Sequence, residues 1–257
     1  MTVQRIAARA AAFGAAVVLT VTSGAVARAD DDIESLPAQE IADRSRDALL
    51  GAESLHMRVE GDLGGGRPSM MIDLTLDRSG NCAGGIDLGD DRGKVEIVKR
   101  GDAVWLKPDA DFWENQVPVG GAAFDAILAG RYMKGEASDS RLRPVVDACD
   151  LDTVQELVTD NADTVGGTLT KGTKTTVDGV SAIPVTRSGD GDRRDGRLTV
   201  YVATEGKPYP VRITVRNDSA DAAVDFSRFD RPVPTATPSP EDTVDVSALL
   251  GRTPAPV

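Results

Sequence analysis

Apolar and polar residues alternate with a period of two along two long stretches of the chain, residues 55–109 and 168–230. This period is typical of antiparallel strands that bury one face and expose the other, and Gly, Asp or Pro bounds each short run. The alternating apolar positions are Met57, Val59, Ile72, Leu74, Leu76, Val104 and Leu106 in the first stretch, and Leu198, Val200, Val202, Val211, Ile213 and Val215 in the second.

Three segments carry helical spacing instead, at residues 35–51, 120–130 and 150–161. In the first, Ser35 is placed to cap the helix and Gly51 to end it. The order is then one helix, five strands, two helices and five strands, without repeated βαβ units. It predicts an α+β fold in which a single curved antiparallel sheet, a half-barrel of about ten short strands, wraps around a few short helices.

Three regions follow from composition. Residues 1–29 have Arg5 and Arg9 before an apolar run and small residues at its end, as in a secretory signal peptide. An uncleaved membrane anchor is the alternative, but the run of roughly 12 residues is short of the about 20 that a spanning helix needs. Residues 30–234 are expected to form the folded domain, and the Pro-rich residues 235–257 a flexible tail.

This leader predicts a secreted or extracytoplasmic protein, in the cell envelope or outside the cell. The segment near the leader holds no cysteine, so we expect no lipid anchor through an N-terminal cysteine and no transmembrane anchor after cleavage. Removing Arg5, Arg9 and Arg28 changes the net charge from −12 to −15. So acidic a chain is poorly suited to bind nucleic acid.

Export also bears on the two cysteines, Cys82 and Cys149. Because oxidising compartments favour disulfides and an even count leaves none over, we expect them to pair; a reactive thiol is the alternative. The bridge would tie the start of a strand to the start of the helix at residue 150, with Cα atoms about 4.4 to 6.8 Å apart.

The sequence offers no evident catalytic set and predicts neither an enzyme nor a cofactor or metal site. His56 is the single histidine and falls on a solvent-facing strand position, and no GxSxG motif occurs. Asp109 and Asp111, and the loop with Asp190, Asp192 and Asp195, do not follow the calcium-loop pattern and suit solvated turns better. Trp105 and Trp113 are expected to pack together at the end of a hairpin; contact with a ligand is the alternative.

Several segments together resemble the LolA-like lipid-carrier superfamily, and more closely the mycobacterial LppX and LprG lipoproteins. They are "ALLGAESLHMRVEG", "GNCAGGIDLG", "VEIVKRGDAVWLKPDADFW", "LAGRYMKG" and the ending "VDFSRFDRPVP", within residues 33–234. The resemblance implies a half-barrel around helices with an apolar cavity for acyl chains. The thirteen alternating residues named above are then candidates for its wall.

The resulting hypothesis is a secreted, non-enzymatic lipid-binding or carrier protein that acts as a monomer on a hydrophobic ligand, with an envelope protein as a possible partner. The alternative is an extracytoplasmic sensor or protein-interaction module that uses the same fold without a lipid. A hydrolase is the third reading, disfavoured because no nucleophile and base stand out.

Overall fold

The structure is a computed structural model that describes residues 32–62, 69–117, 119–162, 167–189, 196–218 and 220–246. The predicted signal peptide, the loop with Asp190, Asp192 and Asp195, and the end of the tail from residue 247 lie outside the described residues.

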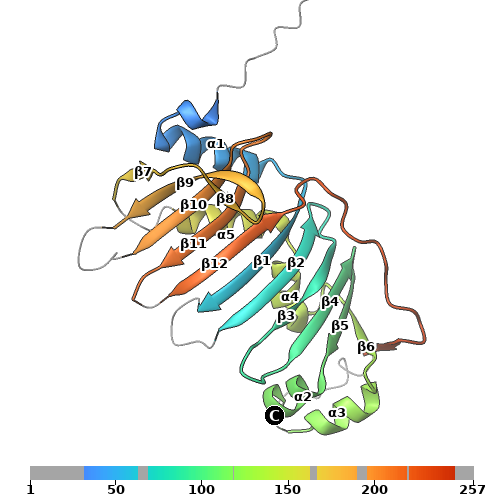
Figure 1. Cartoon of the computed structure of the whole chain (residues 1–257). Helices are drawn as coiled ribbons and strands as arrows, with labels where there is room; N and C mark the ends of the chain where they lie inside the picture. Colours follow the sequence, from blue (N-terminus) through green and yellow to red (C-terminus); the bar gives the residue numbers. More distant parts are fainter. Residues whose placement is uncertain are drawn as a thin grey trace, which may run out of the picture. The chain divides into compact units, whose positions relative to one another are not determined.

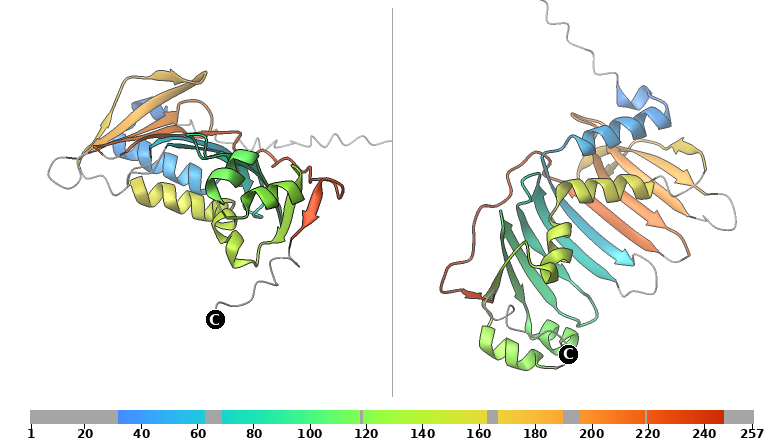
Figure 2. Two further views of the ribbon diagram at one scale, coloured as in Figure 1. Left: turned by 90° about the horizontal axis from the view of Figure 1, so that it is seen from below. Right: turned by 180° about the vertical axis from the view of Figure 1, so that it is seen from behind.

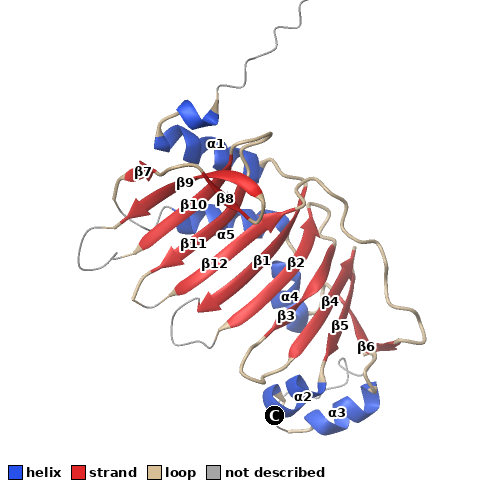
Figure 3. Ribbon diagram, viewed as in Figure 1, coloured by secondary structure: helices blue, strands red, loops and turns tan. Residues whose placement is uncertain are grey.

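Runs of strands and groups of short helices follow one another along the chain, as expected for an α+β domain (Figure 3). The helices are η1 (Ile33–Ser35), α1 (Ala38–Leu50), α2 (Ala110–Gln116), α3 (Gly121–Leu128), η2 (Ser140–Leu142), α4 (Arg143–Ala148) and α5 (Leu151–Ala162). The strands are β1 (Ser54–Asp62), β2 (Met70–Asp77), β3 (Cys82–Asp87), β4 (Lys94–Arg100), β5 (Ala103–Pro108), β6 (Tyr132–Glu136), β7 (Leu169–Lys171), β8 (Thr175–Val177), β9 (Val180–Ser188), β10 (Arg197–Ala203), β11 (Pro210–Arg216), β12 (Asp221–Ser227) and β13 (Thr243–Asp245).

All the strands in the described residues belong to one sheet made of two meanders. The first meander runs from β1 to β6 and the second from β7 to β12. The order is β13-β6-β5-β4-β3-β2-β1-β12-β11-β10-β9-β7, with β8 also paired to β9, so β1 and β12 join the two meanders side by side (Figure 1). Every pairing is antiparallel except β13 with β6. The predicted α+β class with one open antiparallel sheet is confirmed. The sheet has thirteen strands rather than about ten, because β6 and β13 were not foreseen and β7 and β8 are separate.

Three of the helices cover one face of this sheet. α4 and α5 belong to the connection between the two meanders, and α1 precedes the central strand β1; all three lie on the same side (Figure 2). α1 contacts α5 and strands β7, β9, β10 and β11. The alternating apolar residues are buried on this side. Leu55 and Leu74, for example, pack in one cluster with Leu151 of α5 and have no exposed surface.

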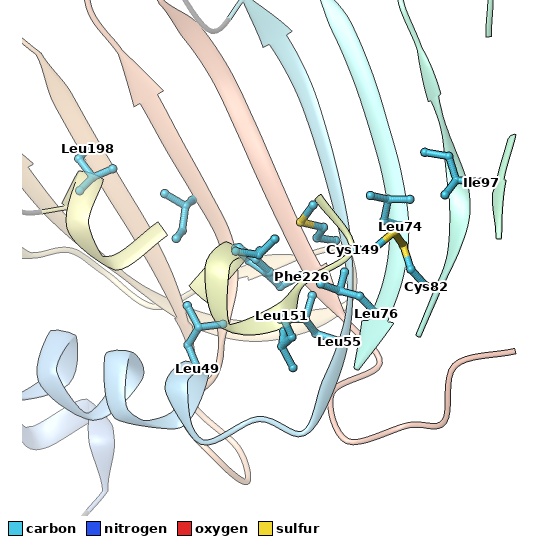
Figure 4. Packing of buried hydrophobic residues seen from close by; sticks show 13 residues of the cluster. Leu49, Leu55, Leu74, Leu76, Cys82, Ile97, Cys149, Leu151, Leu198 and Phe226 are labelled. Carbon is cyan, nitrogen blue, oxygen red and sulfur yellow. A yellow bond between two sulfur atoms is a disulfide. The ribbon is translucent and has the colours of Figure 1, made fainter. Parts of the chain in front are cut away.

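A disulfide lies in the main core. Cys82 begins β3, and Cys149 follows α4; their Cα atoms are 5.3 Å apart, so the predicted pairing is confirmed. Both are fully buried among Leu74, Leu76 and Leu151 (Figure 4). The bridge therefore fixes the junction of α4 and α5 to the sheet.

Helix boundaries differ from the sequence expectation at α1. Ser35 ends the turn η1 and does not cap α1, which begins after the extended residue Pro37. The terminator Gly51 has φ −85° rather than a left-handed conformation. Pro37 has no side-chain group that can accept a hydrogen bond, so the first N–H groups of α1 have no side-chain cap.

The chain also forms two short helices that the sequence did not predict, α2 and α4, whereas α3 is the helix expected at residues 120–130. α2 begins at Asp109, whose carboxylate accepts a hydrogen bond of 2.9 Å from the N–H of Phe112, so this acidic stretch is a helix start and not a turn. Trp113 on α2 stacks on Phe124 of α3, with ring centroids 5.7 Å apart. The expected pairing with Trp105 is wrong, since Trp105 lies on β5 beneath the ammonium of Lys134.

The first part of the predicted flexible tail is joined to the sheet. Residues 228–242 cross from the end of β12 to the far edge, where β13 pairs with β6 (Figures 1 and 2). The N–H of Tyr132 donates to the carbonyl of Asp242 over 2.8 Å, and that of Val246 to the carbonyl of Lys134 over 3.1 Å. These backbone partners lie on the otherwise open edge of β6, and the composition of the tail does not indicate that the two segments pair.

Candidate functional site

A pocket of about 90 Å³ lies between α1, α5 and the second meander. Both helices contribute to it, and the strands involved are β7, β9, β10 and β11. Its apolar wall consists of Ala42, Leu49, Val158, Leu169, Val185, Leu198, Val200, Pro210 and Ile213. An apolar hollow under a helical layer is suited to bind hydrocarbon.

The same pocket has a polar side. It is made by Gln39, Asp43, Ser45 and Arg46 of α1, Thr159 of α5 and Arg187 of β9. The hydroxyl of Thr159 donates to the carbonyl of Gln155 over 3.0 Å, so it is satisfied within its own helix. The pocket is therefore amphipathic.

Three of the thirteen predicted wall residues line this pocket: Leu198, Val200 and Ile213. The others lie elsewhere on the sheet. Met57, Leu74 and Leu76 are buried in the main core; Ile72, Leu106 and Val215 pack against it; Val202 packs with Ile41 in a second cluster; and Val59 and Val104 are buried outside both clusters.

Val211, the thirteenth residue, is displaced by an irregularity in β11. The register between β10 and β11 shifts after Tyr201, so that Val202 lies opposite Pro210. Pro210 is fully buried and lines the pocket, whereas Val211 is half-buried and does not. Simple alternation cannot foresee an extra residue in one strand.

The sequence reasoning also missed the helix side of the pocket, although signals for it existed. Ala42, Ser45 and Leu49 belong to one helical face, of which Ser45 and Leu49 are buried. On β9, Arg187 follows the buried residues Ile183 and Val185 at the same alternating spacing. A charged residue is rarely found where the alternation expects a buried apolar side chain, so Arg187 was a signal in the sequence for a polar group on the inner face.

Gln155 holds the two helices of the pocket together. Its side chain is 2% exposed, and its Nε2 donates to the carbonyl of Leu49 over 2.6 Å and to that of Ala52 over 3.3 Å. Carbonyls at the end of a helix have no partner within that helix. Gln155 of α5 therefore completes the hydrogen bonding of the end of α1.

His56 lies on the opposite face of the sheet, between β12 and β2. Its Nδ1 is 2.9 Å from Oγ of Ser227, and its Nε2 is 2.8 Å from Oδ1 of Asp73. The three residue types are those of a serine hydrolase. In the usual arrangement, however, Nε2 faces the serine and Nδ1 the carboxylate, and here the ring is connected the other way round. These bonds link three neighbouring strands.

A second hollow of about 350 Å³ lies over β2, β3 and β4, where Gly84 and Gly85 have no side chains. Its rim carries Lys94 and Asp87, whose charged groups are 3.0 Å apart. Its apolar side chains are only Met71, Ile86 and Val95, against nine in the pocket under α1, so it is less suited to hydrocarbon.

Large apolar side chains are exposed at one end of the sheet. Val119 is 90% exposed, Phe124 46% and Ile127 57%, on α3 and the loop before it. We call these three residues the α3 patch. It is separate from the pocket, whose lining includes none of them.

Within the described ranges, no group of three or more His, Cys, Asp or Glu residues is arranged to hold a metal ion. Of the helices in those ranges, none has the length and hydropathy needed to cross a membrane.

Comparisons with known proteins give matches among solved structures. The chain is similar to the lipoprotein LppX of Mycobacterium tuberculosis, at 17% identity and a TM-score of 0.46, over 77% of this chain and 98% of that one. It is similar to LprF of Mycobacterium bovis at 18% identity and a TM-score of 0.49, over 79% and 97% of the two chains. A LolA superfamily protein of Nitrosomonas europaea matches at 11% identity and a TM-score of 0.28, over 78% and 96%.

No family model matches the chain, and no curated protein does. The solved structures that match thus include a lipoprotein LppX and a LolA superfamily protein, the kinds of protein named in the sequence comparison above.

Proposed function

We propose that this protein is a secreted, non-enzymatic lipid carrier that holds an acyl chain in the pocket between α1, α5 and strands β7, β9, β10 and β11. The observation that carries the proposal is the apolar wall of that pocket, with nine apolar residues drawn from two helices and four strands. Burial of a hydrocarbon chain against such a wall is favourable at about 25 cal/mol per Å².

The pocket must enlarge to bind a lipid. Its volume of about 90 Å³ is below the roughly 300–1,000 Å³ typical of ligand sites. The disulfide at Cys149 fixes the start of α5, and Gln155 ties α5 to the end of α1. We therefore expect the two helices to lift from β9 and β10 together, with the bridged junction as the pivot.

Binding of radiolabelled palmitate to the purified chain tests the carrier function. We expect Val200→Trp, which fills the pocket, to abolish binding, and Tyr201→Trp to leave it intact, because Tyr201 is the next residue on β10 and is not part of the pocket. Circular dichroism checks that both variants fold. If palmitate does not bind the parent chain, or binds Val200→Trp equally well, the proposal fails.

The α3 patch favours a second candidate, a protein-interaction module. Exposed apolar side chains that cluster on a surface often mark contact sites. In that case Phe124→Asp should abolish capture of one stoichiometric envelope protein. If the protein is a carrier without this partner, neither the parent chain nor Phe124→Asp captures such a protein, and palmitate binding is unchanged.

The absence of enzymatic activity is likewise part of the proposal, and the contacts of His56 make it worth testing. We expect p-nitrophenyl esters to be turned over no faster by the parent chain than by His56→Gln. Turnover that is lost in His56→Gln would instead identify a hydrolase.

A further inference from the structure

The hydroxyl of Ser45 is buried in the pocket without a hydrogen-bond partner. Ser45 is 2% exposed and lines the pocket, and among the described residues its Oγ has no donor or acceptor. A serine within a helix can bond a carbonyl of the preceding turn, and Ser45 does not. An unsatisfied buried hydroxyl costs free energy, so a partner supplied by a ligand would recover that loss.

Two guanidinium groups line the same pocket. Arg187 pairs in register with Leu198 of β10 and Leu169 of β7, and all three residues line the pocket. Arg46 belongs to α1, next to Ser45. One carboxylate, that of Asp43, also lines the pocket, so the lining carries one net positive charge in a chain whose net charge is −12.

We infer that the ligand is an amphiphile with an anionic, oxygen-bearing head group, such as a carboxylate, and that Ser45 and Arg187 recognise this group while the acyl chain lies along Leu198 and Val200. A carboxylate oxygen accepts the hydrogen bond that Ser45 has to offer, and a guanidinium binds carboxylates through two parallel N–H groups. This inference rests on the proposed carrier function and adds the chemical class of the ligand.

The inference predicts different affinities for two amphiphiles that have similar hydrocarbon chains and different head groups. Myristate has an anionic head with acceptor oxygens, and tetradecyltrimethylammonium has a cationic head with none. Because the whole protein is acidic, a non-specific electrostatic effect would favour the cation. We expect the parent chain to bind myristate at least tenfold more tightly, since a hydrogen bond to a charged group contributes that much or more.

Two variants and their controls localise the effect. We expect Ser45→Ala and Arg187→Gln each to weaken myristate binding about tenfold or more and to leave cation binding unchanged or tighter. Ser140→Ala and Arg143→Gln make the same chemical changes away from the pocket, and they should bind like the parent chain.

Stability of the unliganded protein gives a second readout. Since Ser45 Oγ has no partner, Ser45→Ala removes a buried polar group and adds a better helix former, and Tm should rise by about 2–4 °C. A serine that serves only the fold would lower Tm when replaced. We therefore expect Ser45 to give tighter ligand binding and Ala at the same position to give the more stable unliganded protein.

The outcomes distinguish this inference from the carrier function. If both amphiphiles bind and neither Ser45→Ala nor Arg187→Gln changes myristate affinity, the head group lies elsewhere; the inference is then overturned while the carrier function stands. A preference of the parent chain for the cation overturns it as well. If neither amphiphile binds, the carrier function fails and the inference fails with it.

Discussion

The two meanders of the sheet bury the same kind of alternating apolar face in different ways. Under β1, β2 and β3 the face is filled: Leu74, Leu76 and Cys82 have no exposed surface and pack against the start of α5. Under β9, β10 and β11 the covering helix α1 presents the small residues Ala42 and Ser45, and a pocket remains. The same helix also presents Ile41, which packs with Ile183 and Val202 in a filled cluster, so the pocket lies only where α1 presents small side chains.

A loss as large as that of any single core residue should come from the disulfide that fixes the filled half. Replacing Cys82 and Cys149 together by Ala releases a cross-link with a sequence separation of 67. The loss should be about 4 kcal/mol in the free energy of unfolding, measured by urea titration. A parent chain treated with reductant is the control and should lose a similar amount; an unchanged urea midpoint in both would contradict the clamp.

A matched pair of leucines compares the two halves directly. Leu74→Ala opens a cavity in the filled core and should lower the free energy of unfolding by about 3–5 kcal/mol. Leu198 belongs to the same buried cluster but also borders the pocket, so its side chain has fewer packed neighbours to lose, and we expect Leu198→Ala to cost about 2 kcal/mol or less. Urea unfolding of both variants measures the difference. Equal losses would mean that the pocket half is as tightly packed as the core.

The link between α1 and α5 should have an intermediate effect. Gln155→Ala leaves the carbonyls of Leu49 and Ala52 without their side-chain donor and should cost about 2 kcal/mol. Faster amide exchange in α1, relative to β1, is the expected signature. Gln116→Ala, at an exposed position of α2, is the control and should leave exchange in α1 as it is.

The smallest effect concerns a surface ion pair at the end of β12. Lys207, the N–H of Glu53 and the hydroxyl of Tyr209 all donate to Asp230 and lower its pKa to about 2. The folded form thus prefers the ionised carboxylate, so this stabilisation is present above about pH 4 and is lost as the pH falls through 2.

Because Asp230 is well exposed to solvent, we expect its contribution to be below about 1 kcal/mol. Urea midpoints at pH 7 and pH 2.5 should differ less for Asp230→Asn than for the parent chain. The same difference in both proteins would show that Asp230 does not contribute to the acid sensitivity.

Much of the fold follows from local pattern. Nine of the alternating runs became strands β1 to β5 and β9 to β12, and the disulfide followed from export and an even count. The helices α2 and α4 escaped because, with seven and six residues, each is too short to show a helical period. β13 escaped because its partner β6 is distant in sequence, and a tail of Pro and Thr does not reveal which edge is open.

The candidate site was harder to foresee than the fold. Leu198 and Ile213 belong to the same buried cluster as Met57, Leu74 and Leu76 and carry the same pattern, yet only Leu198 and Ile213 of these also line the pocket. The distinction depends on α1, whose position on the second meander is a long-range contact. Likewise Ser227 and Asp73 reach His56 only through strand pairing, since they lie on β12 and β2.

Photo-crosslinking of a lipid tests most directly the claim that the pocket between α1, α5 and the second meander holds an acyl chain. Palmitate with a diazirine near its methyl end would be bound, irradiated and mapped by mass spectrometry. We predict adducts on pocket residues such as Leu198, Val200 and Ile213. Adducts confined to Phe124 and Ile127 of the α3 patch, or no adducts at all, would contradict the account.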